Sequence, residues 1–247
     1  MKAYAITDIG RKRMMNQDYA YLSIEKIGGL DNLFIVADGM GGHRGGGFAS
    51  RLAVESILAG VVGGTADSPQ QILVDAIRRA NEDILQTAQE DERLTGMGTT
   101  VVAATCCGDQ LVVANVGDSR LYVADEGQIR QITQDHSLVE EMVRAGSLSR
   151  EQAKNHPDRN IITRAVGVEE DLKVDCFFVK VKAGDRVLLC SDGLTNMLED
   201  EEIRRILTED ADVEERARKL VRTANEHGGR DNIAVVILEP LSDEVSL

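Results

Sequence analysis

The sequence lacks several features that would indicate particular classes of protein. It has only three prolines among 247 residues and no low-complexity stretch, so nothing marks a linker between separate domains. It also lacks an apolar run of about 18 residues, and its N-terminus, MKAYAITDIG, has no long apolar core. Neither a membrane span nor a signal peptide is therefore expected. These absences predict one compact, soluble domain that works in the cytoplasm.

Positive charge is also scarce. Lys and Arg number 28 against 42 Asp and Glu, which gives a formal net charge of -14 at pH 7. This sign is wrong for a protein that binds a phosphate backbone, so no nucleic-acid partner is expected. Because the same charge repels phosphorylated ligands at long range, a phosphate-handling site would need local cations, either arginine or metal.

The cysteines and histidines do not have the spacing of a zinc site. The four cysteines form no CxxC pair, and the four histidines form no HExxH or other paired motif. Free thiols in a reducing compartment are the simpler interpretation. His43 lies five residues after Asp38, where it is either a proton donor or an exposed loop histidine.

The glycine-rich stretch FIVADGMGGHRGGG, from Phe34 to Gly47, lacks the signatures of common phosphate-binding loops. It has no lysine for a P-loop, and Arg44 stands where a GxGxxG motif needs its third glycine. Met40, two residues after Asp38, breaks the DxD pattern of phosphoaspartyl enzymes. Nucleotide binding by those routes and covalent catalysis by Asp38 are therefore disfavoured.

The apolar pattern predicts strands and helices in separate groups, which is typical of an α+β fold with antiparallel sheets. The three strands expected at 99–105, 110–116 and 120–124 look like one antiparallel meander. Ser149 to Gln152 resembles a helix capping box. The other expected strands are 3–7, 19–24, 33–37, 160–165, 173–181, 186–190 and 232–238, and the expected helices are 48–62, one opening at Ser68-Pro69, 137–156 with a break at Gly146, 200–207 and 213–226.

Four aspartates lie at the ends of these expected strands. Asp38 and Asp192 follow apolar strands in VADG and CSDG, Asp118 lies in GDS, and Asp231 precedes the last strand. Any one of them, taken alone, is better explained as a turn residue, because Asp-Gly is a common turn dipeptide. Four together favour a site for Mg²⁺ or Mn²⁺, which bind carboxylate oxygens and water. Two such ions could promote displacement at phosphorus.

The order of these stretches resembles the metal-dependent protein phosphatases of the PPM (type 2C) family, and in particular its bacterial branch. The matching stretches are TDIGRKRMMNQD, VADGMGGH, GMGTTVVAA, ANVGDSRLY, QITQDHSLV, NIITRAVG, LLCSDGLTNML and GGRDNIAVVIL. The resemblance implies a four-layer αββα sandwich, in which helices flank two antiparallel sheets. It also implies a single catalytic domain over residues 1–240, with a flap at about 137–160 and a short polar tail at 241–247.

The resemblance further implies a metal centre. Asp38 would bridge two Mn²⁺ or Mg²⁺ ions, the Gly39 carbonyl would bind one of them, and Asp192 and Asp231 would complete the first ion's carboxylates. Asp118, together with Asp192, would hold a third, weaker ion.

Three further residues have roles implied by the same resemblance. Arg13 aligns with the arginine that binds phosphate, a role suited to a guanidinium because it can hold two phosphoryl oxygens. Asp18 aligns with an acid that orients metal-bound water. His43 stands where bacterial members have a histidine near the site, and it would be the acid for the leaving group.

The expected function is hydrolysis of phosphoserine and phosphothreonine on proteins, by attack of a hydroxide that bridges two ions. The expected partners are phosphoprotein substrates and a cognate Ser/Thr kinase, and the expected state is a monomer. Two alternatives remain: a phosphohydrolase for small phosphoesters, and a non-catalytic scaffold that binds phosphoproteins.

Overall fold

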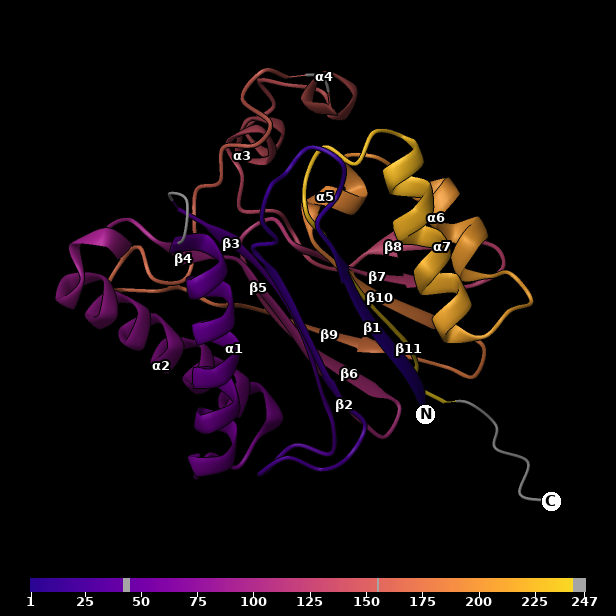
Figure 1. The fold of residues 1–247 in the computed structure, drawn as a ribbon. Coiled ribbons are helices and arrows are strands. Elements are labelled where there is room, and N and C mark those ends of the chain that lie inside the picture. Colours follow the sequence, from indigo (N-terminus) through magenta and orange to yellow (C-terminus); the bar gives the residue numbers. More distant parts are fainter. Residues whose placement is uncertain (42–44, 155, 242–247) are drawn as a thin grey trace.

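The computed structural model describes residues 1–41, 45–154 and 156–241. Two antiparallel sheets pack face to face, and helices cover both outer faces (Figure 1). The strands are β1 (Lys2–Asp8), β2 (Asp18–Ser23), β3 (Leu33–Met40), β4 (Gly98–Thr99), β5 (Val101–Cys107), β6 (Gln110–Val116), β7 (Arg120–Ala124), β8 (Ile129–Gln131), β9 (Asp175–Lys180), β10 (Arg186–Cys190) and β11 (Ile233–Glu239). The predicted α+β fold with four layers, αββα, is confirmed.

The helices lie in two groups on opposite sides of the sandwich. They are α1 (Gly45–Gly63), α2 (Pro69–Glu90), a 3-10 turn at Glu92–Leu94, α3 (Leu138–Arg144), α4 (Arg150–Lys154), α5 (Asp192–Thr195), α6 (Asp200–Leu207) and α7 (Val213–Glu226). Figure 1 shows α1 and α2 on the side of the β2–β3–β5–β6–β9 sheet, and α6 and α7 on the side of the β1–β11–β10–β7–β8 sheet. The short helices α3 and α4 project beyond the upper edge of the sandwich.

The sheets are buried on both faces, which explains their continuous apolar runs. In β3, every residue from Leu33 to Ala37 has an exposed fraction of zero. Val36, Leu189 and Val236 belong to the cluster between the sheets, whereas Ile35 packs under α1 and α2. Because helices cover the outer faces, alternation of polar and apolar residues is not required here.

Helix α1 is apolar because it is part of this core. By length and composition alone it could cross a membrane, but half of it is buried inside the molecule. Ala49, Ala53 and Ile57 lie in the same buried cluster as the residues of the β3–β5–β6 sheet. The apolarity of α1 is therefore explained by packing.

The starts of two helices, α2 and α4, agree with the capping signals in the sequence. Ser68 caps α2 by accepting a hydrogen bond from the Gln71 amide, with Pro69 as the first helical residue. The capping box of α4 is also present, since the Ser149 amide donates to Gln152 and the Gln152 amide donates to Ser149. These contacts satisfy amides that a helix start leaves unpaired.

Two expectations about strands were wrong. Residues 110–116 and 120–124 are strands, but β6 and β7 do not pair: β6 lies between β5 and β9, whereas β7 pairs with β10 and β8. Residues 160–165 form only an isolated bridge, Ser137 to Ile162. For residues 110–116 and 120–124 the apolar pattern identified the strands correctly, but their pairing depends on which sheet each strand joins.

Candidate metal centre

The predicted aspartates come together at one edge of the sandwich, delivered by both sheets. In one sheet, Asp18 of β2 lies directly opposite Asp38 of β3 in the antiparallel register. In the other, Asp192 follows β10 and begins α5, while Asp231 comes just before the neighbouring strand β11. Asp118 lies in the turn between β6 and β7, where the chain crosses from one sheet to the other.

Their electrostatics show that these carboxylates share one buried site. Burial, followed by repulsion from Asp18 and Asp192, raises the pKa of Asp38 well above its usual value. Burial and Asp192 also raise the pKa of Asp118 to about 8. Burial raises the pKa of Asp192 too, and Asp231 adds to that shift. A cluster of buried anions that repel one another is stable as carboxylates only if cations neutralise it.

Asp18 lies opposite Asp38, and only one of its two carboxylate oxygens has a hydrogen-bond partner among the described residues. Its Oδ2 accepts a hydrogen bond from the Ser191 hydroxyl at 2.6 Å. Its Oδ1 is buried and has no hydrogen-bond partner among the described residues. Burial raises the pKa of Asp18 to about 7. Since buried acceptors are normally satisfied, this oxygen marks a position for a hydrogen-bond donor such as water.

The chemistry of the donor set fits Mg²⁺ or Mn²⁺. Both are hard ions that combine carboxylates with several waters. Within residues 1–41, 45–154 and 156–241, no group of three or more His, Cys, Asp or Glu side chains is arranged to hold an ion by itself. Water and backbone carbonyls would therefore have to complete the coordination, as is usual for these ions.

Close backbone packing explains two of the glycines at this edge. A Cβ on Gly39 would lie 2.0 Å from the Gly46 carbonyl oxygen, at the start of α1. A Cβ on Gly193 would lie 1.8 Å from the Asn232 carbonyl oxygen. A side chain at Gly39 would push β3 away from the start of α1, and one at Gly193 would push apart the segments that carry Asp192 and Asp231.

Arg13 lies at the rim of the site. Its Nη2 donates a hydrogen bond to Asp231 Oδ2 at 2.6 Å, and its side chain is about half exposed at 51%. The hydrogen bond to Asp231 raises the pKa of Arg13, and the charges of Asp38 and Asp192 also contribute. The predicted phosphate-binding arginine is therefore an exposed guanidinium beside the acidic cluster. His43, the predicted acid, lies outside the described residues.

Two supporting residues were not predicted. Asn232 anchors the loop that carries Arg13: its side-chain amide donates to the carbonyls of Ile9 and Met15, and its Oδ1 accepts from the Gln17 amide. Asn196 donates to Asp192 Oδ2 at 2.9 Å. The signal for Asn232 was present in the sequence, because it is a polar residue between Asp231 and an apolar strand, but only tertiary structure shows its partners.

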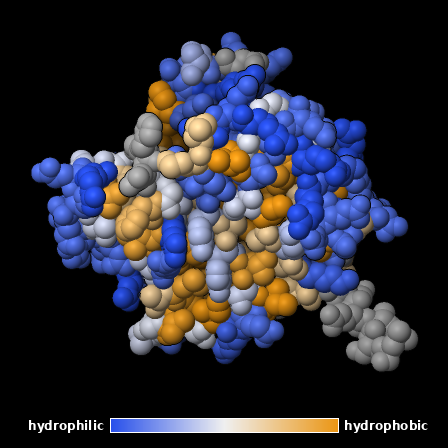
Figure 2. All heavy atoms as spheres, in the orientation of Figure 1, coloured by the Kyte–Doolittle hydropathy of each residue, from blue (hydrophilic) through white to orange (hydrophobic). Residues whose placement is uncertain are grey.

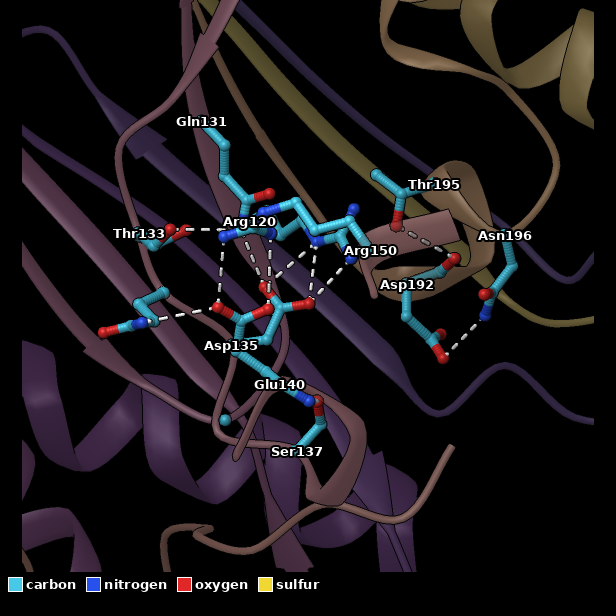
Figure 3. Close-up of polar contacts among 12 residues, drawn as sticks. Arg120, Gln131, Thr133, Asp135, Ser137, Glu140, Arg150, Asp192, Thr195 and Asn196 are labelled. Atoms are coloured by element: carbon cyan, nitrogen blue, oxygen red, sulfur yellow. Dashed lines mark hydrogen bonds and ion pairs between the residues drawn. The ribbon is translucent and has the colours of Figure 1, made fainter. Parts of the chain in front are cut away.

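A cavity of about 470 Å³ opens beside Asp118 and Asp192. Arg120 and Asp135 line it together with α3, α4 and the segment from α5 to α6 (Figure 3). The part of the surface around α3 and α4 is mostly hydrophilic (Figure 2). The segment predicted to be a flap contains α3 and α4, and residues of both helices line this cavity.

Comparison with known proteins decides the family. The sequence matches the family described as Protein phosphatase 2C over residues 10–236. The chain belongs to this protein phosphatase family. Among protein phosphatase 2C relatives, the serine/threonine phosphatase stp of Listeria monocytogenes is 43% identical, over 97% of this chain and 96% of that protein.

Solved structures agree with this membership. Serine/threonine phosphatase Stp1 from Staphylococcus aureus has a TM-score of 0.88 at 34% identity, covering 96% of this chain and 93% of the other. The catalytic domain of serine/threonine protein phosphatase PstP, in complex with two manganese ions, has a TM-score of 0.83 at 33% identity, covering 96% of both. The protein phosphatase 2C fold therefore extends over nearly the whole chain.

Proposed function

We propose that the protein is a metal-dependent phosphatase that removes phosphate from serine and threonine residues of proteins. The observation that carries this proposal is the buried cluster of Asp38, Asp192 and Asp118, because burial and mutual repulsion raise their pKa values and bound cations would favour their ionised forms. The family and the similarity to serine/threonine phosphatases support the reaction class. The small-phosphoester and scaffold alternatives are less well supported, because all of the predicted aspartates lie at one edge of the sandwich and the relatives are protein phosphatases.

Asp38, Asp192, Asp231 and the Gly39 carbonyl would hold two Mn²⁺ or Mg²⁺ ions, and Asp118 with Asp192 would hold a third. When bound, such ions supply an activated water and neutralise charge on the phosphoryl oxygens.

The chain's own residues would orient the reactants. Arg13 would bind two phosphoryl oxygens through its guanidinium and so position phosphorus above the acidic cluster. Asp18 Oδ1, which is buried and free, would accept a hydrogen bond from the attacking water, while Ser191 holds the other oxygen in place. His43 would protonate the leaving alkoxide.

The proposal includes a cytoplasmic site of action, a monomeric state and substrates phosphorylated by a cognate Ser/Thr kinase. The four cysteines are free in the structure, which suits a reducing compartment. The proposal also includes the predicted domain organisation: one catalytic domain over residues 1–240, with a flap at about 137–160, and a short polar tail at 241–247.

The direct test is hydrolysis of a phosphothreonine peptide in EDTA and after addition of Mn²⁺, with p-nitrophenyl phosphate as a small substrate. We expect no turnover in EDTA, recovery with Mn²⁺, and a higher kcat/KM for the peptide. Absence of activity in every metal would favour a scaffold, and a preference for the small substrate would favour the phosphoesterase.

Arg13→Ala is expected to raise KM for the phosphopeptide by about tenfold, since a hydrogen bond to a charged group contributes about 1.5–3 kcal/mol. Arg13→Lys should recover only part of this loss, because lysine keeps the charge but not the two-pronged geometry. Steady-state kinetics in saturating Mn²⁺ measure the effect. An unchanged KM in both variants would remove Arg13 from phosphate binding.

A further inference from the structure

The turn that carries Asp118 is an unusual junction, because it joins the two sheets. Val116 pairs with Val101 in one sheet, and Arg120 pairs with Cys190 in the other. Gly117 between them has a φ of +104°, and a Cβ there would lie 2.6 Å from the Thr100 side chain. The position of Asp118 therefore depends on a tight turn between the two sheets, and residues 117–119 of this turn pair with neither sheet.

Asp135 and His136 contact this turn on both sides of Asp118. Arg120 makes a forked ion pair with Asp135: Nε lies 3.0 Å from both carboxylate oxygens, and Nη2 lies 2.7 Å from Oδ2. On the other side of Asp118, the Gly117 amide donates to His136 Nδ1, and the His136 amide donates to the Gly117 carbonyl, both at 3.0 Å. We call Gly117, Arg120, Asp135 and His136 the clasp.

The clasp is held rigidly by its surroundings. Arg120 also donates to the hydroxyl of the buried Tyr122, and Gln131 donates to Asp135 at 2.7 Å. The Asp135 and Arg120 side chains are 12% and 28% exposed, so this pair is partly shielded from solvent. Burial lowers the pKa of His136, which leaves Nδ1 free to accept the bond from Gly117. A forked, partly shielded pair of this kind constrains geometry far more than a surface ion pair does.

The same residues form the base of the flap. Directly after His136, Ser137 caps α3 by accepting from the Glu140 amide. The returning limb pairs with this start, because the Thr163 amide donates to the His136 carbonyl and the Leu138 amide donates to the Ile161 carbonyl. Both ends of the flap thus meet at the clasp, and Glu140 of α3 contacts Arg150 of α4 beside Arg120 and Asp135 (Figure 3).

Arg120 also lies close to the acidic cluster. It begins β7 two residues after Asp118, and it pairs with Cys190, which is two residues before Asp192. The residue that pairs with Asp135 at the flap base is therefore close in the chain and in the sheet to both carboxylates expected to share an ion.

We propose that Arg120 and Asp135 are positioning residues that couple the flap to the cation shared by Asp118 and Asp192. The inference rests on the proposed function, which assigns that cation to Asp118. A cation that draws Asp118 into one orientation stabilises the turn, the clasp and thus the flap base. By thermodynamic reciprocity, a flap held by substrate strengthens binding of the same cation.

The test combines Mn²⁺ calorimetry with hydrogen exchange of peptides covering α3 and α4. In the wild type, we expect Mn²⁺ that fills the weakest site to slow exchange in those peptides. Asp135→Asn keeps the size of the side chain but removes the charge partner of Arg120. It should weaken that site about tenfold, as loss of a residue supporting a metal ligand commonly does. It should also abolish the effect of Mn²⁺ on α3 and α4, and leave the tighter sites nearly unchanged.

Arg120→Lys and Lys154→Gln serve as matched variants. Arg120→Lys keeps the charge without the forked geometry and should recover only part of the affinity. Lys154→Gln breaks the ion pair of α4 with Glu199 but leaves the clasp intact. It should speed exchange in α4 while the weak Mn²⁺ site keeps its affinity. Thermal unfolding of each variant verifies that it is folded.

Asp118→Asn distinguishes the assignment of a cation to Asp118 from the coupling of that cation to the flap. It should remove the weakest Mn²⁺ site and the response of the flap. If its binding curve matches the wild type, the assignment of Asp118 is wrong and the inference fails with it. If Asp118→Asn loses the site, but Asp135→Asn and Arg120→Lys keep both affinity and flap response, the coupling alone is overturned.

Discussion

Asp38→Asn is expected to lower kcat for the phosphothreonine peptide by on the order of a thousandfold, because it removes a charge that organises the site for the transition state. Asparagine keeps the shape of the side chain but is a poorer ligand for a hard divalent ion. Mn²⁺ calorimetry should show the loss of the tightest binding along with the loss of activity.

Although it lowers activity, Asp38→Asn should raise the stability of the protein once metal is removed. Burial raises the pKa of Asp38 well above its usual value, and repulsion from Asp18, Asp192, Asp118 and Asp231 adds to that shift. A neutral amide relieves this repulsion, so in EDTA the variant should unfold at a higher temperature than the wild type. In excess Mn²⁺ the order should reverse, because the wild type gains more from binding.

Asp109→Asn is a suitable control for both measurements, because Asp109 lies in the hairpin at the far end of β5 and β6. It should change neither kcat nor the Mn²⁺ response. Near-wild-type turnover by Asp38→Asn would refute the role of Asp38, and lower stability of that variant in EDTA would contradict the repulsion argument.

The second large effect concerns pH. In EDTA, the unfolding temperature should fall as pH rises from about 5 to about 8, by on the order of 5–10 °C for a chain of this size. The folded pKa values of Asp18 and Asp118, about 7 and about 8, lie above the ordinary value of 3.8. The folded state therefore holds protons that the unfolded chain has already released, and the free energy of unfolding decreases through this window.

Excess Mn²⁺ should reverse the trend, since cations bind the ionised carboxylates and compete with protons. Differential scanning calorimetry at several pH values, in EDTA and in Mn²⁺, measures both slopes. Asp118→Asn is the matched control: it removes one of the titrating groups and should flatten the decline in EDTA. An unfolding temperature that rises with pH in EDTA would show that these carboxylates are not protonated in the folded protein.

Much of the site was predictable because its parts are local. Asp38 lies near the end of β3, Asp192 comes just after β10 and Asp231 just before β11, so their positions near strand ends could be predicted without tertiary information. The resemblance then assigned a role to each residue, and the family it indicated is confirmed. The roles of individual residues stay predictions.

The crossing between β6 and β7 was not predictable in the same way. Both segments have the apolar pattern of strands, and the short turn between them is typical of a hairpin. The pattern of burial is the same whether β7 pairs with β6 or leaves for the other sheet, because the sandwich buries both faces of each sheet. The meander was therefore wrong, although both strands are present.

The sequence by itself determined most of the strands and helices, the caps of α2 and α4, and the acidic residues near the strand ends. These depend on periodicity and on contacts a few residues apart. Only tertiary structure decided which sheet receives β7, which carboxylates share a buried site, and that Asp135 holds Arg120 at the base of the flap. Such contacts join residues from separate elements, and their energies arise from burial and charge that exist only once the two sheets have packed.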